Sequence, residues 1–238
     1  MKHWLFLSLL CLSGRSLLLA QQDSIPAKSP VFKAGFYLGT NCTIPKDPNI
    51  NDPSYSVSGK PEWGYELGLR TTFRLSRFFL FSTGLSYSEI RYHTNLFGGN
   101  QYYNGDPYIL DESTKEFSFN MPLTILARLQ SGKFEYYAGI GAEVTMFYKY
   151  QDDGKVTING QTKSPGELGL NYSELDFCLR PGLTFGLNYR KNSKMDFFAE
   201  GGVKNVKFGY GYFSNLYTVY FNTGIMYSLF TKSNPERK

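Results

Sequence analysis

The segment from Lys133 to Tyr150, KFEYYAGIGAEVTMFYKY, alternates between two chemically different sets of side chains. Such alternation over this length predicts a β-strand with an apolar and a polar face. The fold depends on which face is enclosed. The mostly apolar set is Phe134, Tyr136, Ala138, Ile140, Ala142, Val144, Met146 and Tyr148, and the polar set includes Glu135, Gly139, Gly141, Glu143 and Thr145.

The same period of two recurs along the chain and predicts eight strands, with no helical segment and no domain boundary. Tight turns, read as LSR, SGK and KNSK, alternate with longer, turn-rich connections. Short turns at one end and long loops at the other are typical of an all-β, eight-stranded antiparallel up-and-down transmembrane β-barrel. The predicted strands are 33–43, 62–76, 78–94, 116–130, 133–150, 172–190, 194–207 and 217–230.

The apolar face is banded, with aromatic residues near the strand ends and aliphatic residues between them. A soluble barrel with its apolar face around a ligand has no need of such bands, whereas a membrane barrel places aromatic girdles at both lipid interfaces. Strand lengths also exceed the ~9–11 residues that a barrel strand needs to cross a bilayer. The predicted interface aromatics are Trp63, Tyr65, Phe73, Phe134, Tyr136, Tyr148, Tyr189, Tyr217 and Tyr227.

The polar face combines glycines with charges of both signs. Glycine weakens a strand exposed to water, but in a narrow barrel it leaves room for larger side chains. We therefore expect opposite charges to pair inside the lumen, the alternative being a solvated face. The predicted lumen network is Glu66, Arg70, Arg128, Glu135, Glu143, Asp176, Arg180, Asp196, Glu200 and Lys204.

Residues 1–20 have a charged start, an apolar run and a small residue before Gln21, and this pattern predicts a cleaved signal peptide. A mobile segment (21–32), the barrel (33–231) and a periplasmic tail (232–238) are expected to follow, with the protein in the bacterial outer membrane. Cys42 and Cys178 are predicted on opposite faces, so no disulfide is expected between them. Without residues 1–20, 23 basic residues stand against 20 acidic ones, too even a balance to predict nucleic-acid binding.

Two adjacent runs, EFSFNMPLTILARL (116–129) and YYAGIGAEV (136–144), resemble the outer-membrane β-barrel domain of Bacteroidota, which includes the PorT-like proteins. The resemblance covers essentially the whole mature chain. It implies an eight-stranded outer-membrane barrel without known catalytic residues. For the PorT-like members it also implies a link to type IX secretion.

These observations predict a non-enzymatic outer-membrane protein that acts as a scaffold or interaction component, with no cofactor or metal. Its partners would be outer-membrane lipids, and envelope or secretion proteins that contact the extracellular loops. Aromatic residues in these loops are candidate contacts, although they could instead pack over the barrel mouth. These candidates are Tyr102, Tyr103, Tyr210, Tyr212 and Phe213.

Two alternative functions are a small lipid-modifying enzyme and a narrow pore. A hydrolase would need His93 within reach of a serine, but His93 and Glu89 fall on one face of their strand while Ser86 and Ser88 fall on the other. An eight-stranded barrel has a lumen filled by side chains, which argues against a permanent channel. The carboxylate pairs at Asp111-Glu112 and Asp152-Asp153 do not have the spacing of a calcium loop.

Overall fold

The computed structural model describes residues 32–46, 55–99, 107–158, 160–164, 167, 176–206 and 215–229. The predicted signal peptide, nearly all of segment 21–32, and the C-terminal tail lie outside these ranges, so their assignments stay predictions. The candidate loop contacts also lie outside them: Tyr102, Tyr103, Tyr210, Tyr212 and Phe213.

Nine strands account for most of the described chain, and every strand pairs antiparallel to its neighbours. No helix among the described residues has the length and apolar character required to cross a membrane. The strands are β1 (Phe32–Lys46), β2 (Tyr55–Arg74), β3 (Phe79–Gly99), β4 (Pro107–Ser131), β5 (Phe134–Ile158), β6 (Gln161–Lys163), β7 (Asp176–Arg190), β8 (Met195–Val206) and β9 (Asn215–Ser228).

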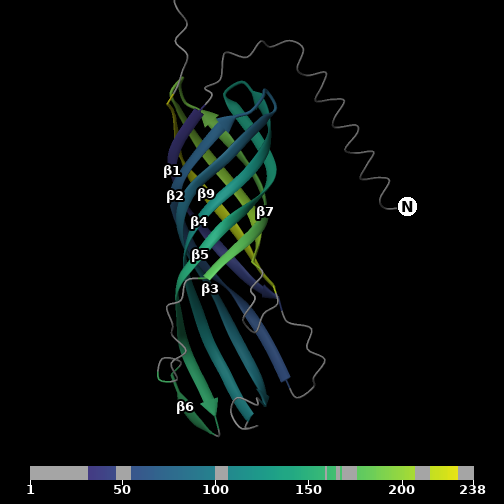
Figure 1. Ribbon diagram of the computed structural model, residues 1–238, viewed down its shortest axis with the longest axis vertical. Helices are drawn as coiled ribbons and strands as arrows, with labels where there is room; N and C mark the ends of the chain where they lie inside the picture. Colours follow the sequence, from purple (N-terminus) through teal and green to yellow (C-terminus); the bar gives the residue numbers. More distant parts are fainter. Residues whose placement is uncertain are drawn as a thin grey trace, which may run out of the picture. The chain divides into compact units, whose positions relative to one another are not determined.

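Eight of these strands form a closed ring (Figure 1). The sheet runs β4-β3-β2-β1-β9-β8-β7-β5, and pairing of β4 with β5 completes the circle. The short strand β6 lies outside the ring and pairs only with the end of β5. The predicted eight-stranded up-and-down barrel is therefore confirmed.

The ring has two different ends. The turn end carries the three tight turns, and the first residue of β1 and the last residues of β9 also lie there. At the opposite, extended end, β2 to β5 continue beyond the ring as an open sheet that β6 joins (Figure 1). We call this projecting sheet, residues 55–61, 92–99, 107–115, 150–158 and 160–163, the extension.

The extension corrects the prediction that most of these residues form loops. Their sequence lacks the apolar alternation of a membrane strand, because polar residues occur on both faces. In the structure they continue the hydrogen-bonded ladders of the barrel, as in the pairing of Leu96 with Leu110 and of Leu110 with Val156. A strand outside the lipid needs no apolar outer face. Backbone pairing with the neighbouring strands is therefore enough to hold these residues in strand conformation.

Two bulges mark the boundary between the barrel and the extension. The register of β2 against β3 shifts between Pro61 and Tyr65, and that of β5 against β4 shifts near Tyr148. A bulge inserts one residue and reverses the facing of those that follow. Phe147 is therefore buried while Lys149 is exposed, although strict alternation places both on one face.

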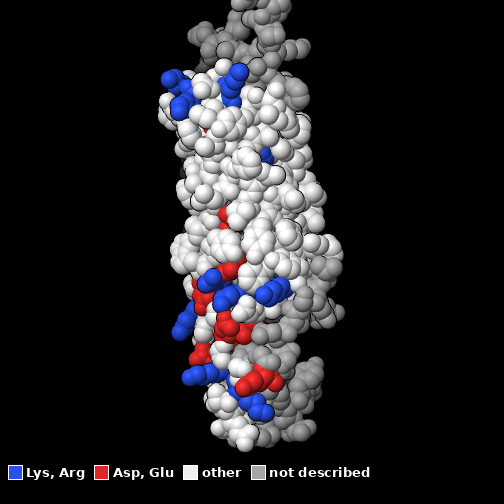
Figure 2. Space-filling model, turned by 90° about the vertical axis from the view of Figure 1, so that its left-hand side faces the viewer, with Lys and Arg blue, Asp and Glu red and all other residues white. Residues whose placement is uncertain are grey.

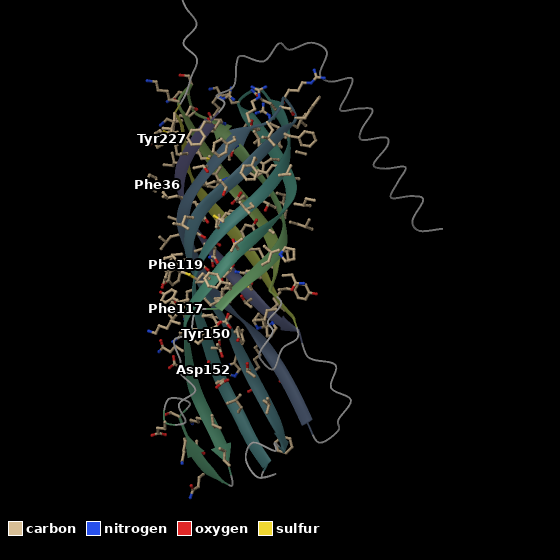
Figure 3. All side chains as sticks on the ribbon, viewed as in Figure 1. Phe36, Phe117, Phe119, Tyr150, Asp152 and Tyr227 are labelled. Atoms are coloured by element: carbon tan, nitrogen blue, oxygen red, sulfur yellow. The ribbon has the colours of Figure 1, made fainter. Side chains whose placement is uncertain are left out.

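The faces of the barrel are inverted relative to a soluble protein. Large apolar side chains are exposed around the outside, among them Phe36, Trp63 and Ile140, each with 68% of its surface accessible. Phe36 points away from the wall in Figure 3. On the face seen in Figure 2, basic side chains gather at the turn end, a band with almost no charge follows, and mixed charges cover the extended end. This band is the lipid-facing belt.

Candidate functional site

The lumen holds a network of charged side chains in three successive levels. Nearest the turn end, Lys33 Nζ lies 2.5 Å from Asp196 Oδ2, and Arg128 Nη1 lies 2.8 Å from Glu135 Oε2. Glu135 also accepts a hydrogen bond of 2.7 Å from the Asn188 amide. The side chains of all four charged residues are at most 7% exposed, so this level seals the lumen with ion pairs.

The middle level is centred on Arg70. Its guanidinium pairs with Glu200 and donates to the Tyr137 hydroxyl over 3.1 Å. Its charged carbon also lies 4.9 Å from the centroid of the Phe198 ring. A buried arginine is stabilised by such cation–π contacts in addition to its ion pair.

The third level joins four charges from four strands. Lys204 Nζ lies 2.6 Å from Glu143 Oε2 and 3.3 Å from Glu66 Oε2, while Arg180 Nη1 lies 3.3 Å from Glu143 Oε1. Tyr37 donates a hydrogen bond of 2.6 Å to Glu66. A cavity of about 50 Å³ lies among these groups, which is room for water-sized molecules only.

The lumen glycines make room for tyrosine rings. A Cβ on Gly186 would lie 2.6 Å from the hydroxyl oxygen of Tyr137, and one on Gly202 would lie 2.6 Å from that of Tyr220. Both rings take part in the network, since Tyr137 binds Arg70 and the Lys204 ammonium lies 4.6 Å from the Tyr220 centroid. Glycine at these inward positions thus allows large polar side chains to fill a narrow barrel.

Above the charges, an apolar cluster lies inside the wall at the extended end. Ile90, Phe147, Tyr150 and Leu216 pack together and are at most 8% exposed. Cys178 packs against this cluster from inside, whereas Cys42 stands on the outer face opposite Trp63. Among the described residues, ion pairs fill the lumen toward the turn end and apolar side chains fill it at the extended end.

The structure places nine of the ten predicted lumen charges in this network. The side chain of Asp176 lies outside the described part. Lys33 was missed because it is the first polar residue of β1, where alternation has only begun. The described lumen pairs therefore hold five cations and five carboxylates: Lys33, Arg70, Arg128, Arg180 and Lys204 with Glu66, Glu135, Glu143, Asp196 and Glu200.

The predicted interface aromatics lie on the outer surface, exposed or half-buried. At the extended end Tyr87 contacts the rings of Tyr65, Phe119 and Tyr148, and the Phe119 and Tyr148 rings stack with centroids 5.4 Å apart. Phe119 lies closer to the turn end than Tyr150 does in Figure 3. The exposed members are Trp63, Tyr65, Phe73, Phe134, Tyr136 and Tyr227, and the half-buried ones are Tyr148, Tyr189 and Tyr217.

The inner face of the extension carries carboxylates that sequence reasoning assigned to a loop. Burial, followed by the charge of Asp152, raises the pKa of Glu112 to about 8. Burial also raises the pKa of Asp152, while a hydrogen bond from Thr114 opposes this. Glu116, on the same face, accepts a hydrogen bond of 2.8 Å from Tyr92. Among the described residues, no group of these carboxylates has the arrangement of a metal site.

His93 lies on the outer face of the extension, between two carboxylates. Its Nε2 is 2.7 Å from Asp111 Oδ1, and its Nδ1 is 3.7 Å from Glu62 Oε1. Ser86 and Ser88 point into the lumen, where Ser86 donates to Glu66. The wall therefore separates His93 from both serines, so neither lies within hydrogen-bond reach of the imidazole as a triad would require.

No protein-family model matches the sequence, and no curated protein matches it either. Among solved structures, the chain is similar to the outer membrane protein OprG from Pseudomonas aeruginosa, with 12% identity over 84% of this chain and 96% of OprG, and a TM-score of 0.45. It is also similar to Ail, the attachment invasion locus protein of Yersinia pestis, with 11% identity over 84% and 98% of the two chains and a TM-score of 0.38. Neisserial surface protein A gives 12% identity over 82% and 98%, with a TM-score of 0.39. Independently of these similarities, the closed antiparallel ring of this chain is established by its own strand pairing.

Removal of Glu143 should destabilise the barrel strongly. Glu143→Ala leaves Lys204 and Arg180 without their shared carboxylate inside the lumen, and breaking a buried pair from one side costs about 3–5 kcal/mol. The measurement is urea unfolding of the full chain in phospholipid vesicles. Asp153→Ala, which removes the exposed partner of Lys115, is the control and should cost about 0–1 kcal/mol. If both variants lowered the free energy of unfolding by the same amount, Glu143 would not be part of a sealed, water-free lumen.

The extension should lose local stability as pH rises. The folded-state pKa of Glu112 lies above its ordinary 4.5, so folding retains a proton that the unfolded chain releases between pH 4.5 and about 8. Stability therefore falls across this window and levels off above it. Hydrogen exchange of β4 amides 110–116, corrected for intrinsic rates, should show this fall. Glu112→Gln should flatten it, and an unchanged slope in that variant would refute the role of Glu112.

Proposed function

We propose that the chain is a closed, non-enzymatic outer-membrane barrel whose extension presents a surface to an envelope or extracellular partner. The observation that carries this proposal is the combination of a filled lumen with strands that continue beyond the lipid-facing belt. A barrel without an open channel can contact a partner only through its accessible surface, and the extension provides most of that surface outside the lipid. Binding residues are commonly located on such segments, which a rigid scaffold holds in place.

The orientation follows from charge. Basic residues at the turn end, including Arg77, Lys133 and Lys191, would lie beside anionic lipid phosphates of the inner leaflet. The extension then faces the outside of the cell, as the longer connections of outer-membrane barrels do. The signal peptide predicted at residues 1–20 agrees with export to this membrane.

The resemblance of residues 116–129 and 136–144 to the Bacteroidota barrel family supports a more specific proposal. In that case the partner is an envelope component of the PorT-like kind, such as a part of the type IX secretion machinery. The outer face of the extension offers mixed charges for this contact, including His93, Asp111 and the ion pair of Lys115 with Asp153.

A shortened hairpin tests whether the extension is the working surface. Tyr92 and Thr114 are opposite each other on β3 and β4, so residues 93–113 can be replaced by Asn-Gly, which forms a two-residue hairpin turn. The variant should keep the barrel, seen as a folded band that migrates differently when unheated. It should lose the proteins that co-purify with the full chain from native membranes.

Two outcomes would contradict the proposal. Co-purification that survives in the shortened variant would place the partner surface elsewhere. Stable conductance of the full chain in planar bilayers, abolished by Lys204→Ala but not by the shortened hairpin, would instead identify a pore.

A further inference from the structure

The cations at the turn end form an outer and an inner set. Lys191 belongs to the outer set: it is exposed, and its ammonium lies 5.7 Å from the centroid of the Phe197 ring on the lipid-facing side. The inner set occupies lumen-facing strand positions, because Thr72 and Asn188, two residues before Arg74 and Arg190, are both buried. Its members are Lys33, Arg74, Arg128 and Arg190.

Two carboxylates face the inner set, and both are already in ion pairs. Lys33 Nζ lies 2.5 Å from Asp196 Oδ2, and Arg128 Nη1 lies 2.8 Å from Glu135 Oε2. Arg190 is opposite Asp196 in the register, but its guanidinium makes no ion pair with the described residues. Its charge acts on Glu135 and Arg128 from a greater distance. Arg190 therefore lacks a directly bound anion.

The backbone fixes Arg190 at a defined place on the rim of the barrel. Its N–H donates to the Lys133 carbonyl over 2.8 Å, which joins the end of β7 to the turn between β4 and β5. The side chains of both residues border a shallow depression together with Glu135, Asn188 and Asp196. This depression is too small to enclose a molecule, so it can accept only the end of one projecting group.

A second guanidinium at the same level has an unused donor. Arg128 is 8% exposed, its Nη1 pairs with Glu135, and its Nη2 donates to the Gln130 side chain over 3.2 Å. The Arg128 Nε atom is buried and has no hydrogen-bond partner among the described residues. Because a buried donor without an acceptor destabilises a protein, an oxyanion at this level of the rim would be favoured.

We propose that Arg190, with Lys133 beside it, binds a carboxylate from an acidic peptide segment of a periplasmic protein. The guanidinium of Arg190 donates to this carboxylate as Arg128 does to Glu135. The site lies at the opposite end of the barrel from the extension. It rests on the proposed function only for the side of the membrane that the turn end faces.

Two observations favour a peptide over a lipid phosphate. Arg190 occupies a lumen-facing position of β7, whereas Tyr189 before it lies on the outer surface, so a lipid headgroup would have to cross the rim to reach the guanidinium. The depression is also too small for a phosphate that carries two ester substituents. A carboxylate at the end of a flexible side chain can enter it.

Binding of a labelled peptide, followed by fluorescence anisotropy, tests the site. The probe is a short peptide of alternating Glu and Gly with an uncharged dye, added to the full chain in phosphatidylcholine nanodiscs, which expose both ends of the barrel. Arg190→Gln should weaken binding about ten-fold or more, because a charge-assisted hydrogen bond is lost. Arg190→Lys keeps the charge without the fork of donors and should weaken binding less.

Lys191→Gln is the matched control, because it removes the same charge from the outer set. It should change the affinity by about two-fold or less, and every variant should migrate as a folded barrel when unheated. The shortened hairpin should bind the peptide like the full chain, so this test and that of the proposed function can fail separately.

Three results would overturn the site. The first is a failure of the unmodified chain to bind the peptide. The second is equal weakening by Lys191→Gln and Arg190→Gln, which would mean a diffuse attraction to the basic turn end. The third is displacement of the peptide by phosphatidylglycerol added to the nanodiscs, which would assign Arg190 to a lipid phosphate.

Discussion

The hydrocarbon interior of a membrane offers no hydrogen-bond partner to the backbone, and the rest of this structure depends on that constraint. Each unpaired N–H or C=O group there costs several kcal/mol, so a sheet can cross only if its strands close into a ring. Pairing of β4 with β5 over 24 residue pairs completes that ring. Inside the ring, Glu143, Arg180 and Lys204 also link β5, β7 and β8 through their side chains.

Closure of an eight-stranded ring also determines what can be inside it. Charged residues on the lipid face destabilise a membrane barrel, so that face is apolar. The lumen face is polar in such barrels, and the alternation between the two faces determines which side of each strand faces lipid. The described ion pairs of the lumen accordingly join five cations with five carboxylates. Because side chains fill the interior, the surfaces that remain available to bind other molecules are the extension, the turn end and the lipid-facing wall.

Much of the barrel could be predicted from sequence because the alternation in 134–147 has a direct physical cause. Each even position meets lipid and each odd position meets the lumen. The alternation fails at Tyr148, where a bulge adds one residue and turns Lys149 outward. The extension was predicted as loops because polar residues occur on both of its faces, so its sequence carries no alternating signal. The pairing of Lys33 with Asp196 joins strands 163 residues apart, and only the closed ring brings them together.

The central claim is that β5 separates lipid from a sealed lumen, and a single-cysteine scan of residues 136–145 tests it most directly. In vesicles, with Cys42 and Cys178 replaced by serine, each position is treated with a membrane-soluble and a water-soluble maleimide. The account predicts that even positions react only with the membrane-soluble reagent and that odd positions react with neither. Reaction of odd positions with the water-soluble reagent, or protection of even positions from the membrane-soluble one, would contradict it.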